Sequence, residues 1–125
     1  MKATSLLLTV LIVCLVALSG CGKKYDLKEN AAKIGDAMCR SIDVMNQLKA
    51  ANPEDTGLVM KLRNDESKIQ SEMSVLYEDF NKKWGDKTKK EDFTKEFGRE
   101  LRKAMLDCKS LSKEDRESFM KEIKE

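Results

Sequence analysis

The residue types that could do chemistry in this chain are cysteines, carboxylates and lysines, because its 125 residues include no histidine. Without histidine, acid–base catalysis near neutral pH would need a carboxylate or lysine with a strongly shifted pKa. The carboxylates of Asp65, Glu66 and Asp92 have an ordinary explanation as solvated helix faces. The sequence contains no glycine-rich phosphate loop, nucleophile elbow or metal-ligand spacing. It therefore predicts a protein that is not an enzyme and that has no metal or other cofactor.

The first 21 residues have the pattern of an export signal that ends at a cysteine. A short basic start precedes an almost wholly apolar run over residues 6–18, which is shorter than the roughly 20 residues needed to span a bilayer. The run closes on Leu18-Ser19-Gly20-Cys21, with small residues directly before the cysteine. A basic start, a short apolar run and small residues before a cleavage point are typical of a secretory signal peptide.

Leu18-Ser19-Gly20-Cys21 resembles the lipobox of bacterial lipoproteins. The resemblance covers residues 1–21 only. It implies that residues 1–20 are removed and that Cys21 carries a diacylglyceryl thioether and an acylated amino group. Two or more acyl chains anchor a protein stably where one is marginal. An ordinary signal peptide with a chance cysteine and an uncleaved anchor are the alternatives.

The resemblance also bears on location, and it implies a protein of the cell envelope held on a membrane by its N-terminal lipid. Gly22 stands where lipoproteins of this family use aspartate for retention in the inner membrane. The absence of aspartate at this position favours the outer membrane, if the host has an outer membrane. Whether the domain faces the periplasm or the cell surface stays open.

After processing, residues 21–25 would form a short tether and residues 26–125 one helical domain. Charged residues make up 37% of the chain and there is one proline. Frequent charges with a regular apolar period and few breakers indicate helices throughout. Acidic and basic residues are interspersed, with a net charge of +2, which argues against nucleic acid as a partner.

Apolar residues that recur every three or four positions predict three long helices and a short fourth. The first helix begins at Asp26, where Glu29 completes a capping pair, and ends near Ala51, because Asn52-Pro53 stops it. Ion pairs four residues apart are expected along the exposed helix faces. The single apolar stripe of this helix comprises Leu27, Ala31, Ile34, Met38, Ile42, Met45 and Leu48.

The second helix runs from Pro53 or Thr56 to Trp84. Glu66 interrupts its stripe, either as a locally exposed turn or as a polar notch for a partner. The expected ion pairs on its outer side are Glu78–Lys82 and Asp79–Lys83. Its stripe comprises Val59, Leu62, Ile69, Met73, Leu76, Phe80 and Trp84.

The third helix begins at a capping pair of Thr88 with Glu91 and ends near Ser110, and the fourth begins at Ser112 with Asp115 as its partner. The predicted fold is therefore all-α, an antiparallel three-helix bundle with a short fourth C-terminal helix.

Cys39 and Cys108 are the predicted disulfide. Cys14 leaves with the signal and Cys21 carries the lipid, so these two remain as a pair in an oxidising compartment. With a rise of about 1.5 Å per residue, they lie roughly 18 Å and 15 Å below the turn after Ala51, so the topology lets them meet. The absence of a Cys-x-x-Cys motif and of histidine makes redox and zinc sites weak alternatives.

The same helix lengths place the turn between the second and third helices beside the lipid. Each basic residue near the membrane surface is attracted to anionic headgroups by about 1 kcal/mol. Tryptophan is also favoured at the membrane–water interface. The alternative, in which Trp84 plugs the bundle end and the lysines keep a loop soluble, stays open. The candidate membrane-contact residues are Lys82, Lys83, Trp84, Lys87, Lys89 and Lys90.

Two functions remain. One is a binding module for another envelope protein, and the other is a structural or surface-display lipoprotein without a dedicated ligand. At the level of architecture, a lipobox with a small disulfide-pinned helical domain is similar to the secretin pilotins, lipoproteins that capture a helical segment of a secretion-channel subunit. No residue motif carries this likeness. The candidate partner groove, beside the short fourth helix, comprises Leu76, Leu101, Met105, Phe119, Met120 and Ile123.

Overall fold

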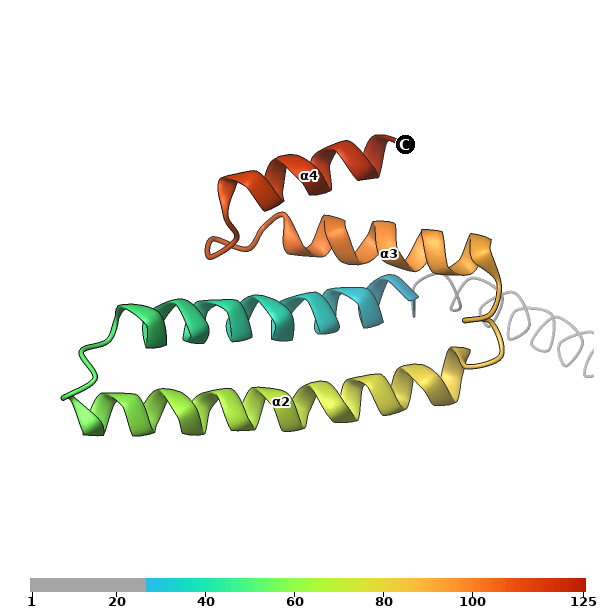
Figure 1. The fold of residues 1–125 in the computed structure, drawn as a ribbon. Helices are drawn as coiled ribbons and strands as arrows, with labels where there is room; N and C mark the ends of the chain where they lie inside the picture. Colours follow the sequence, from blue (N-terminus) through green and yellow to red (C-terminus); the bar gives the residue numbers. More distant parts are fainter. Residues whose placement is uncertain (1–26) are drawn as a thin grey trace, which may run out of the picture.

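The computed structural model describes residues 27–125, and all regular secondary structure in this range is helical. A helix over residues 27–50 is followed by α2 (Thr56–Trp84), α3 (Glu91–Met105) and α4 (Lys113–Lys124). Successive helices run in alternating directions, the 27–50 helix lies between α2 and α3, and α4 lies on the outer side of α3 (Figure 1). The predicted all-α class is confirmed, with bundle-like packing among the first three helices.

Several predictions fall on residues outside the described range. These are the export signal, the lipidated Cys21, the tether and the capping pair that begins at Asp26.

Local signals place three helix ends where the sequence predicted them. The 27–50 helix stops just before Asn52-Pro53, and α2 ends at Trp84. The hydroxyl of Ser112 accepts a hydrogen bond from the Asp115 N–H at 3.1 Å, so the predicted cap of α4 is confirmed. At the start of α2, where no cap was predicted, the Asp55 carboxylate accepts from a backbone N–H of the first turn.

Two predictions about α3 were wrong. Its N-cap residue is Lys90, which makes no side-chain cap, while the Thr88 hydroxyl donates to the Gly85 carbonyl at 2.7 Å. The Thr88 side chain thus stabilises the turn after α2 and does not cap α3. The helix also ends at Met105 and not near Ser110. Beyond Met105, backbone carbonyls that a longer helix would have bonded internally accept hydrogen bonds from a side chain of α4 instead.

The core consists of three apolar clusters, here called the first, second and third clusters. The first joins all of the first three helices: Leu27 and Ile34 meet Phe80 and Trp84 of α2, and aromatic rings of α3 complete it. The rings of Phe80 and Phe97 have centroids 4.4 Å apart. Aromatic side chains therefore bridge α2 and α3 at this end of the molecule.

The second and third clusters divide the other end of the 27–50 helix between two neighbours. In the second cluster, Ala37 and Val44 pack with residues of α2, and Leu48 and Ala51 join them. In the third, Met38 and Ile42 pack against the end of α3 and the segment that follows it. The central helix therefore has two apolar faces instead of the single stripe that was predicted.

Met45 is the residue for which the single-stripe prediction fails. It was expected in the core, but its side chain is 44% exposed, while the neighbouring Val44 is buried against α2. Met45 falls between the two apolar faces, where neither α2 nor the α3 segment covers it fully.

The 27–50 helix and α3 approach closely at Gly35. A Cβ atom at this position would lie 3.0 Å from the Cβ of Ala104 and 3.6 Å from a methyl carbon of Leu101. Gly35 is buried, so the missing side chain is what allows the two helices to pack at this distance.

Candidate functional site

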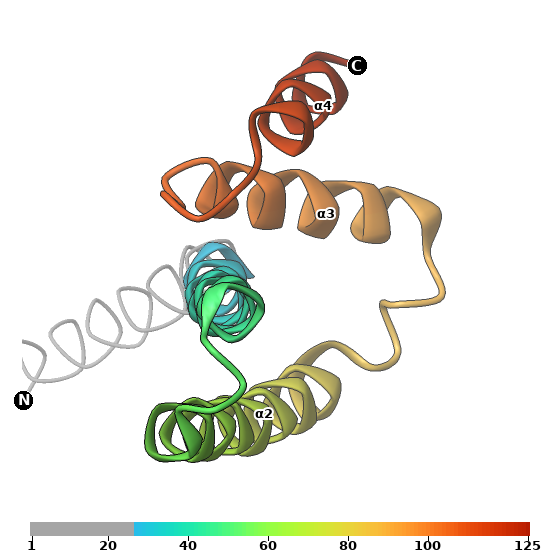
Figure 2. The same cartoon turned by 60° about the vertical axis from the view of Figure 1, so that its left-hand side comes forward.

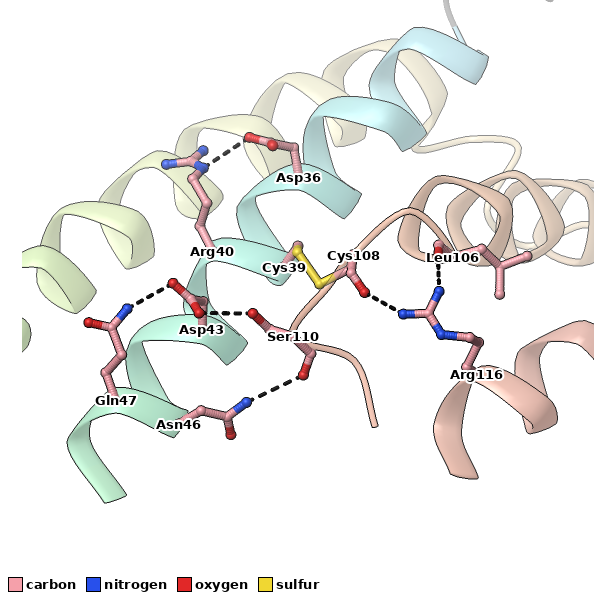
Figure 3. Close-up of a disulfide and its surroundings, with 10 residues drawn as sticks. All are labelled: Asp36, Cys39, Arg40, Asp43, Asn46, Gln47, Leu106, Cys108, Ser110 and Arg116. Atoms are coloured by element: carbon pink, nitrogen blue, oxygen red, sulfur yellow. Dashed lines mark hydrogen bonds and ion pairs between the residues drawn. A yellow bond between two sulfur atoms is a disulfide. The ribbon is translucent and has the colours of Figure 1, made fainter. Parts of the chain in front are cut away.

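Cys39 and Cys108 are brought together at disulfide distance. Their Cα atoms lie 5.6 Å apart and their sulfur atoms 2.02 Å apart, across a sequence separation of 69 residues. The bond joins the middle of the 27–50 helix to the segment after α3 (Figure 3). This is the pair that the helix lengths predicted.

Arg116 of α4 is bonded to the same segment. Its guanidinium donates to the backbone carbonyl oxygens of Leu106 and Cys108, the second at 2.8 Å (Figure 3). Both carbonyls lie beyond the end of α3, so their hydrogen bonds to Arg116 compensate for the helix that stops there. Arg116 was not singled out from the sequence, because nothing in its local pattern distinguishes it from other exposed basic residues.

The 27–50 helix holds this segment from the opposite side. The Ser110 hydroxyl donates to the Asp43 carboxylate at 2.9 Å, and the Asn46 side-chain amide donates to the Ser110 carbonyl oxygen at 3.3 Å (Figure 3). The connection between α3 and α4 is thus fixed by a disulfide, by two hydrogen bonds to the 27–50 helix and by Arg116.

Beside this braced connection lies a cleft of about 290 Å³, here called the Met45 cleft. Ile42, Met45 and Leu111 are its apolar residues, and the exposed Met45 forms part of its wall. The other five residues of its lining are polar or charged, so the cleft combines a small apolar patch with a polar rim. Its full lining is Ile42, Met45, Asn46, Lys49, Ser110, Leu111, Ser112 and Asp115.

The six residues predicted to form a partner groove do not line one surface. Leu76 packs with the first two clusters, Leu101 with the first, and Met105 is buried in the third. The physical reason is the position of α4, which lies on the far side of α3 from α2 (Figure 2). Of the α4 residues, Phe119 packs against the third cluster and Ile123 is half-buried, whereas Met120 is 47% exposed.

Two further clefts border α4, and charged or polar side chains make up most of their lining, as they do in the Met45 cleft. Met120 lies in one of about 430 Å³, and the other, of about 620 Å³, lies between α3 and α4 around Gly98. An ion pair between Arg102 and Glu122, 2.7 Å long, links the two helices at the second cleft. Neither offers the continuous apolar floor that the predicted groove required.

Trp84 is not available for contact with a membrane. Its side chain is 6% exposed and packs in the first cluster with Leu27, and its ring centroid lies 5.5 Å from that of Phe93. Of the two alternatives left open by the sequence, the burial of Trp84 supports the one in which it closes the end of the helix packing, and not the one in which it faces a membrane. Its indole N–H is buried and has no hydrogen-bond partner among residues 27–125.

The lysines around Trp84 are all exposed. Lys82 forms the predicted ion pair with Glu78 at 2.9 Å, but the Asp79–Lys83 pair is not among the ion pairs of residues 27–125. The ammonium nitrogen of Lys87 lies 5.0 Å from the centroid of the Trp84 ring, a cation–π contact.

An ion pair between Arg40 and Glu72 joins the 27–50 helix to α2. Arg40 donates two hydrogen bonds to the two carboxylate oxygens of Glu72, at 2.7 and 3.0 Å. These bonds hold the pKa of Glu72 below its usual value of 4.5. Arg40 also pairs with Asp36 at 2.9 Å, as the sequence predicted for the exposed face of this helix.

Within residues 27–125, no group of three or more cysteine and carboxylate side chains is arranged to hold a metal ion. Over the same range, no helix is both long enough and apolar enough to cross a bilayer. Glu66, the interruption in the α2 stripe, is half-buried and forms no ion pair with the described residues.

Comparisons of the chain with protein-family models, with curated protein sequences and with solved structures found no match. Function is therefore inferred from the chemistry and position of the Met45 cleft, from the lysines around Trp84 and from the residues that precede Cys21.

Proposed function

We propose that this chain is a lipid-anchored protein of the bacterial cell envelope whose helical domain binds a segment of another envelope protein. The anchor is inferred from the apolar run and Leu18-Ser19-Gly20-Cys21, which resemble a lipoprotein signal and lipobox. In this proposal the domain is an antiparallel three-helix bundle, and α4 is a fourth helix that borders the binding surface.

The Met45 cleft carries the binding part of the proposal. An exposed methionine, with Ile42 and Leu111, forms the apolar part of a small hollow whose other five lining residues are polar or charged. Methionine adapts its shape to a partner because it is unbranched and flexible. A volume of about 290 Å³ suits one large apolar side chain, such as an anchor residue projecting from a partner helix.

The wall of the cleft is already rigid before a partner arrives. Ser110 and Leu111 belong to the segment that the Cys39–Cys108 disulfide and Arg116 hold in place. A preorganised site loses little conformational entropy on binding, so a modest contact area gains affinity.

The position of the cleft also fits a partner that approaches from the side away from the lipid. Met45 lies 18 residues after Leu27 in one helix, which is about 27 Å along the helix axis. Residue 27 is near the anchor in sequence, so the cleft is held away from the membrane.

The anchor is tested by replacing Cys21 with serine. The Cys21→Ser protein should incorporate no labelled palmitate and should leave the membrane fraction, because the thioether can form only on that sulfur. Cys14→Ser is the matched control and should be labelled like the native protein. Labelled Cys21→Ser protein would exclude this anchor.

The binding site is tested by placing a photo-crosslinking residue at Met45 in intact cells, with Met60 as the matched position. Met60 is a methionine on α2 that is 65% exposed. Position 45 should crosslink an envelope protein that position 60 does not. With that protein purified, Met45→Asp should weaken binding at least about tenfold, since binding would then have to desolvate a charged group where an apolar contact is proposed, whereas Met60→Asp should not. Equal results at both positions would favour a structural lipoprotein without a ligand.

A further inference from the structure

The turn that joins α2 to α3 is strongly basic and exposed. Residues 82–90 contain five lysines and one acidic residue. Lys82 is engaged by Glu78, but the other four form no ion pair with any residue of the described chain. We call these four the basic turn: Lys83, Lys87, Lys89 and Lys90.

The basic turn lies at the same end of the domain as the start of the 27–50 helix (Figure 1). Leu27 and Trp84 are buried in one apolar cluster, so the two segments are in contact there. Only residues 22–26 separate Cys21 from residue 27. Even a fully extended chain of six residue steps spans only about 20 Å. A lipid on Cys21 would therefore hold the basic turn within reach of the headgroups.

Acidic residues at this end reduce the positive charge but do not cancel it. Asp86 lies within the turn, and Glu91 and Asp92 begin α3. Glu29 also faces this end: its pKa is lowered mainly by its hydrogen bond with Lys33 and further by the charge of Lys83. Glu91 is already paired with Lys95 at 2.8 Å. Residues 82–90 themselves, five lysines less Asp86, keep a net charge of +4 on exposed side chains.

From this geometry we infer that the basic turn contacts the anionic headgroups of the membrane that holds Cys21 and so sets the orientation of the domain. The inference rests on the lipid anchor proposed above. The partner is a surface of anionic phospholipid, and the attraction is electrostatic. It involves no insertion of a ring, because Trp84 is buried and Lys87 lies against its face. The contact should weaken in salt, where the screening length falls from about 10 Å at 0.1 M to about 3 Å at 1 M.

The consequence of this contact is a defined orientation. With the basic turn on the bilayer, the 27–50 helix and α2 extend away from it, and the Met45 cleft faces outward. A tether of a few residues would not impose that orientation by itself, because it restrains position and leaves rotation free.

The test uses the full-length lipidated protein reconstituted into two kinds of vesicle. One contains equal parts of phosphatidylglycerol and phosphatidylcholine, and the other contains phosphatidylcholine alone. Lysine accessibility is read by an amine-reactive label and mass spectrometry. On the anionic vesicles the basic turn should react roughly fivefold more slowly than on the neutral ones, and high salt should restore its reactivity. Lys61 and Lys68, exposed residues in the first half of α2, should react equally on both.

A variant pair separates a local contact from the effect of total charge. Replacing Lys87, Lys89 and Lys90 by glutamine should abolish the protection that remains at Lys83. The matched variant, with glutamine at the exposed Lys61, Lys68 and Lys109, removes the same charge elsewhere and should leave that protection intact.

Each other outcome overturns the inference in a recognisable way. Protein that floats with both vesicles but shows equal lysine reactivity keeps its anchor and lacks the headgroup contact. Protein that floats with neither vesicle has no lipid anchor, and the proposed function fails together with the inference. Protection that appears in cells but on neither vesicle would assign the basic turn to an acidic protein instead of a lipid surface.

Discussion

Arg116 donates a hydrogen bond to the backbone carbonyl oxygen of Cys108 at 2.8 Å, so the last helix is bonded to a residue of the disulfide. Sequence periodicity alone would leave α4 held by a few apolar side chains. In the structure, Arg116 and the Arg102–Glu122 ion pair also hold it against α3 and the segment that follows. The stability of α4 should therefore depend on polar contacts as well as on burial.

Replacing Arg116 by alanine should loosen α4 without unfolding the rest of the domain. The backbone carbonyl oxygens of Leu106 and Cys108 lose a charged hydrogen-bond donor, which should lower the stability of the α4 contact by about 1 to 3 kcal/mol. Amide hydrogen exchange should accelerate in α4 and remain slow in α2. Lys121→Ala removes an exposed basic residue from the same helix and serves as the control. Unchanged exchange in α4 of the Arg116→Ala protein would contradict a bracing role for this residue.

A valine at Gly35 should destabilise the domain, whereas a valine at Gly98 should not. The new side chain at Gly35 would press against Ala104 and Leu101, and overpacking of this kind costs about 1 to 3 kcal/mol. At Gly98 the nearest atom is the end of the flexible Arg102 side chain, at 3.2 Å. There valine should be neutral or gain a few tenths of a kcal/mol, roughly its advantage over glycine in helix propensity. Urea unfolding of both variants measures the difference.

Removal of the disulfide by alanine at both Cys39 and Cys108 should lower the free energy of unfolding by up to about 4 kcal/mol. This is the entropy of closing a loop of about 70 residues in the unfolded chain. Mass spectrometry without reductant should first show the native domain lighter than its reduced form by the mass of two hydrogen atoms. Two freely alkylated thiols in protein purified from the envelope would refute the bond.

Acid should remove the stabilising contribution of the Arg40–Glu72 pair. The pKa of Glu72 is lower in the folded protein than its usual 4.5. A carboxyl group with a lowered pKa stabilises the fold above its unfolded pKa, and that contribution is lost as the pH falls through the folded value. Glu72→Gln should therefore be less stable than the native protein at neutral pH, and the two should converge well below pH 4.5.

Urea unfolding over a pH series measures this convergence. Glu96 is exposed and forms no ion pair within residues 27–125, so Glu96→Gln is the control and should follow the native curve at every pH. A constant gap between the Glu72→Gln and native proteins at all pH values would rule out ionisation as the cause.

Features that depend on neighbouring residues in the chain could be predicted from the sequence. The helical class, the stop at Asn52-Pro53 and the cap at Ser112 follow from periodicity, proline geometry and hydroxyl chemistry, which act over a few residues. The meeting of Cys39 with Cys108 could be predicted as well, because helix lengths fix heights along a bundle. The residues before Cys21 predict the anchor in the same local way.

The tertiary structure alone decided which side chains of those helices meet. A helical period identifies an apolar face but not how many neighbours the helix has, and the 27–50 helix lies between two. Val44 is therefore buried, and Met45 is left at an exposed cleft. Because α4 lies on the far side of α3 from α2, Leu76 of α2 and Met120 of α4 are separated. The contact with Leu27 buries Trp84, while the lysines that flank Trp84 in the sequence stay exposed to water. Burial is a property of the space between helices, and the residues that enclose that space are far apart in the sequence.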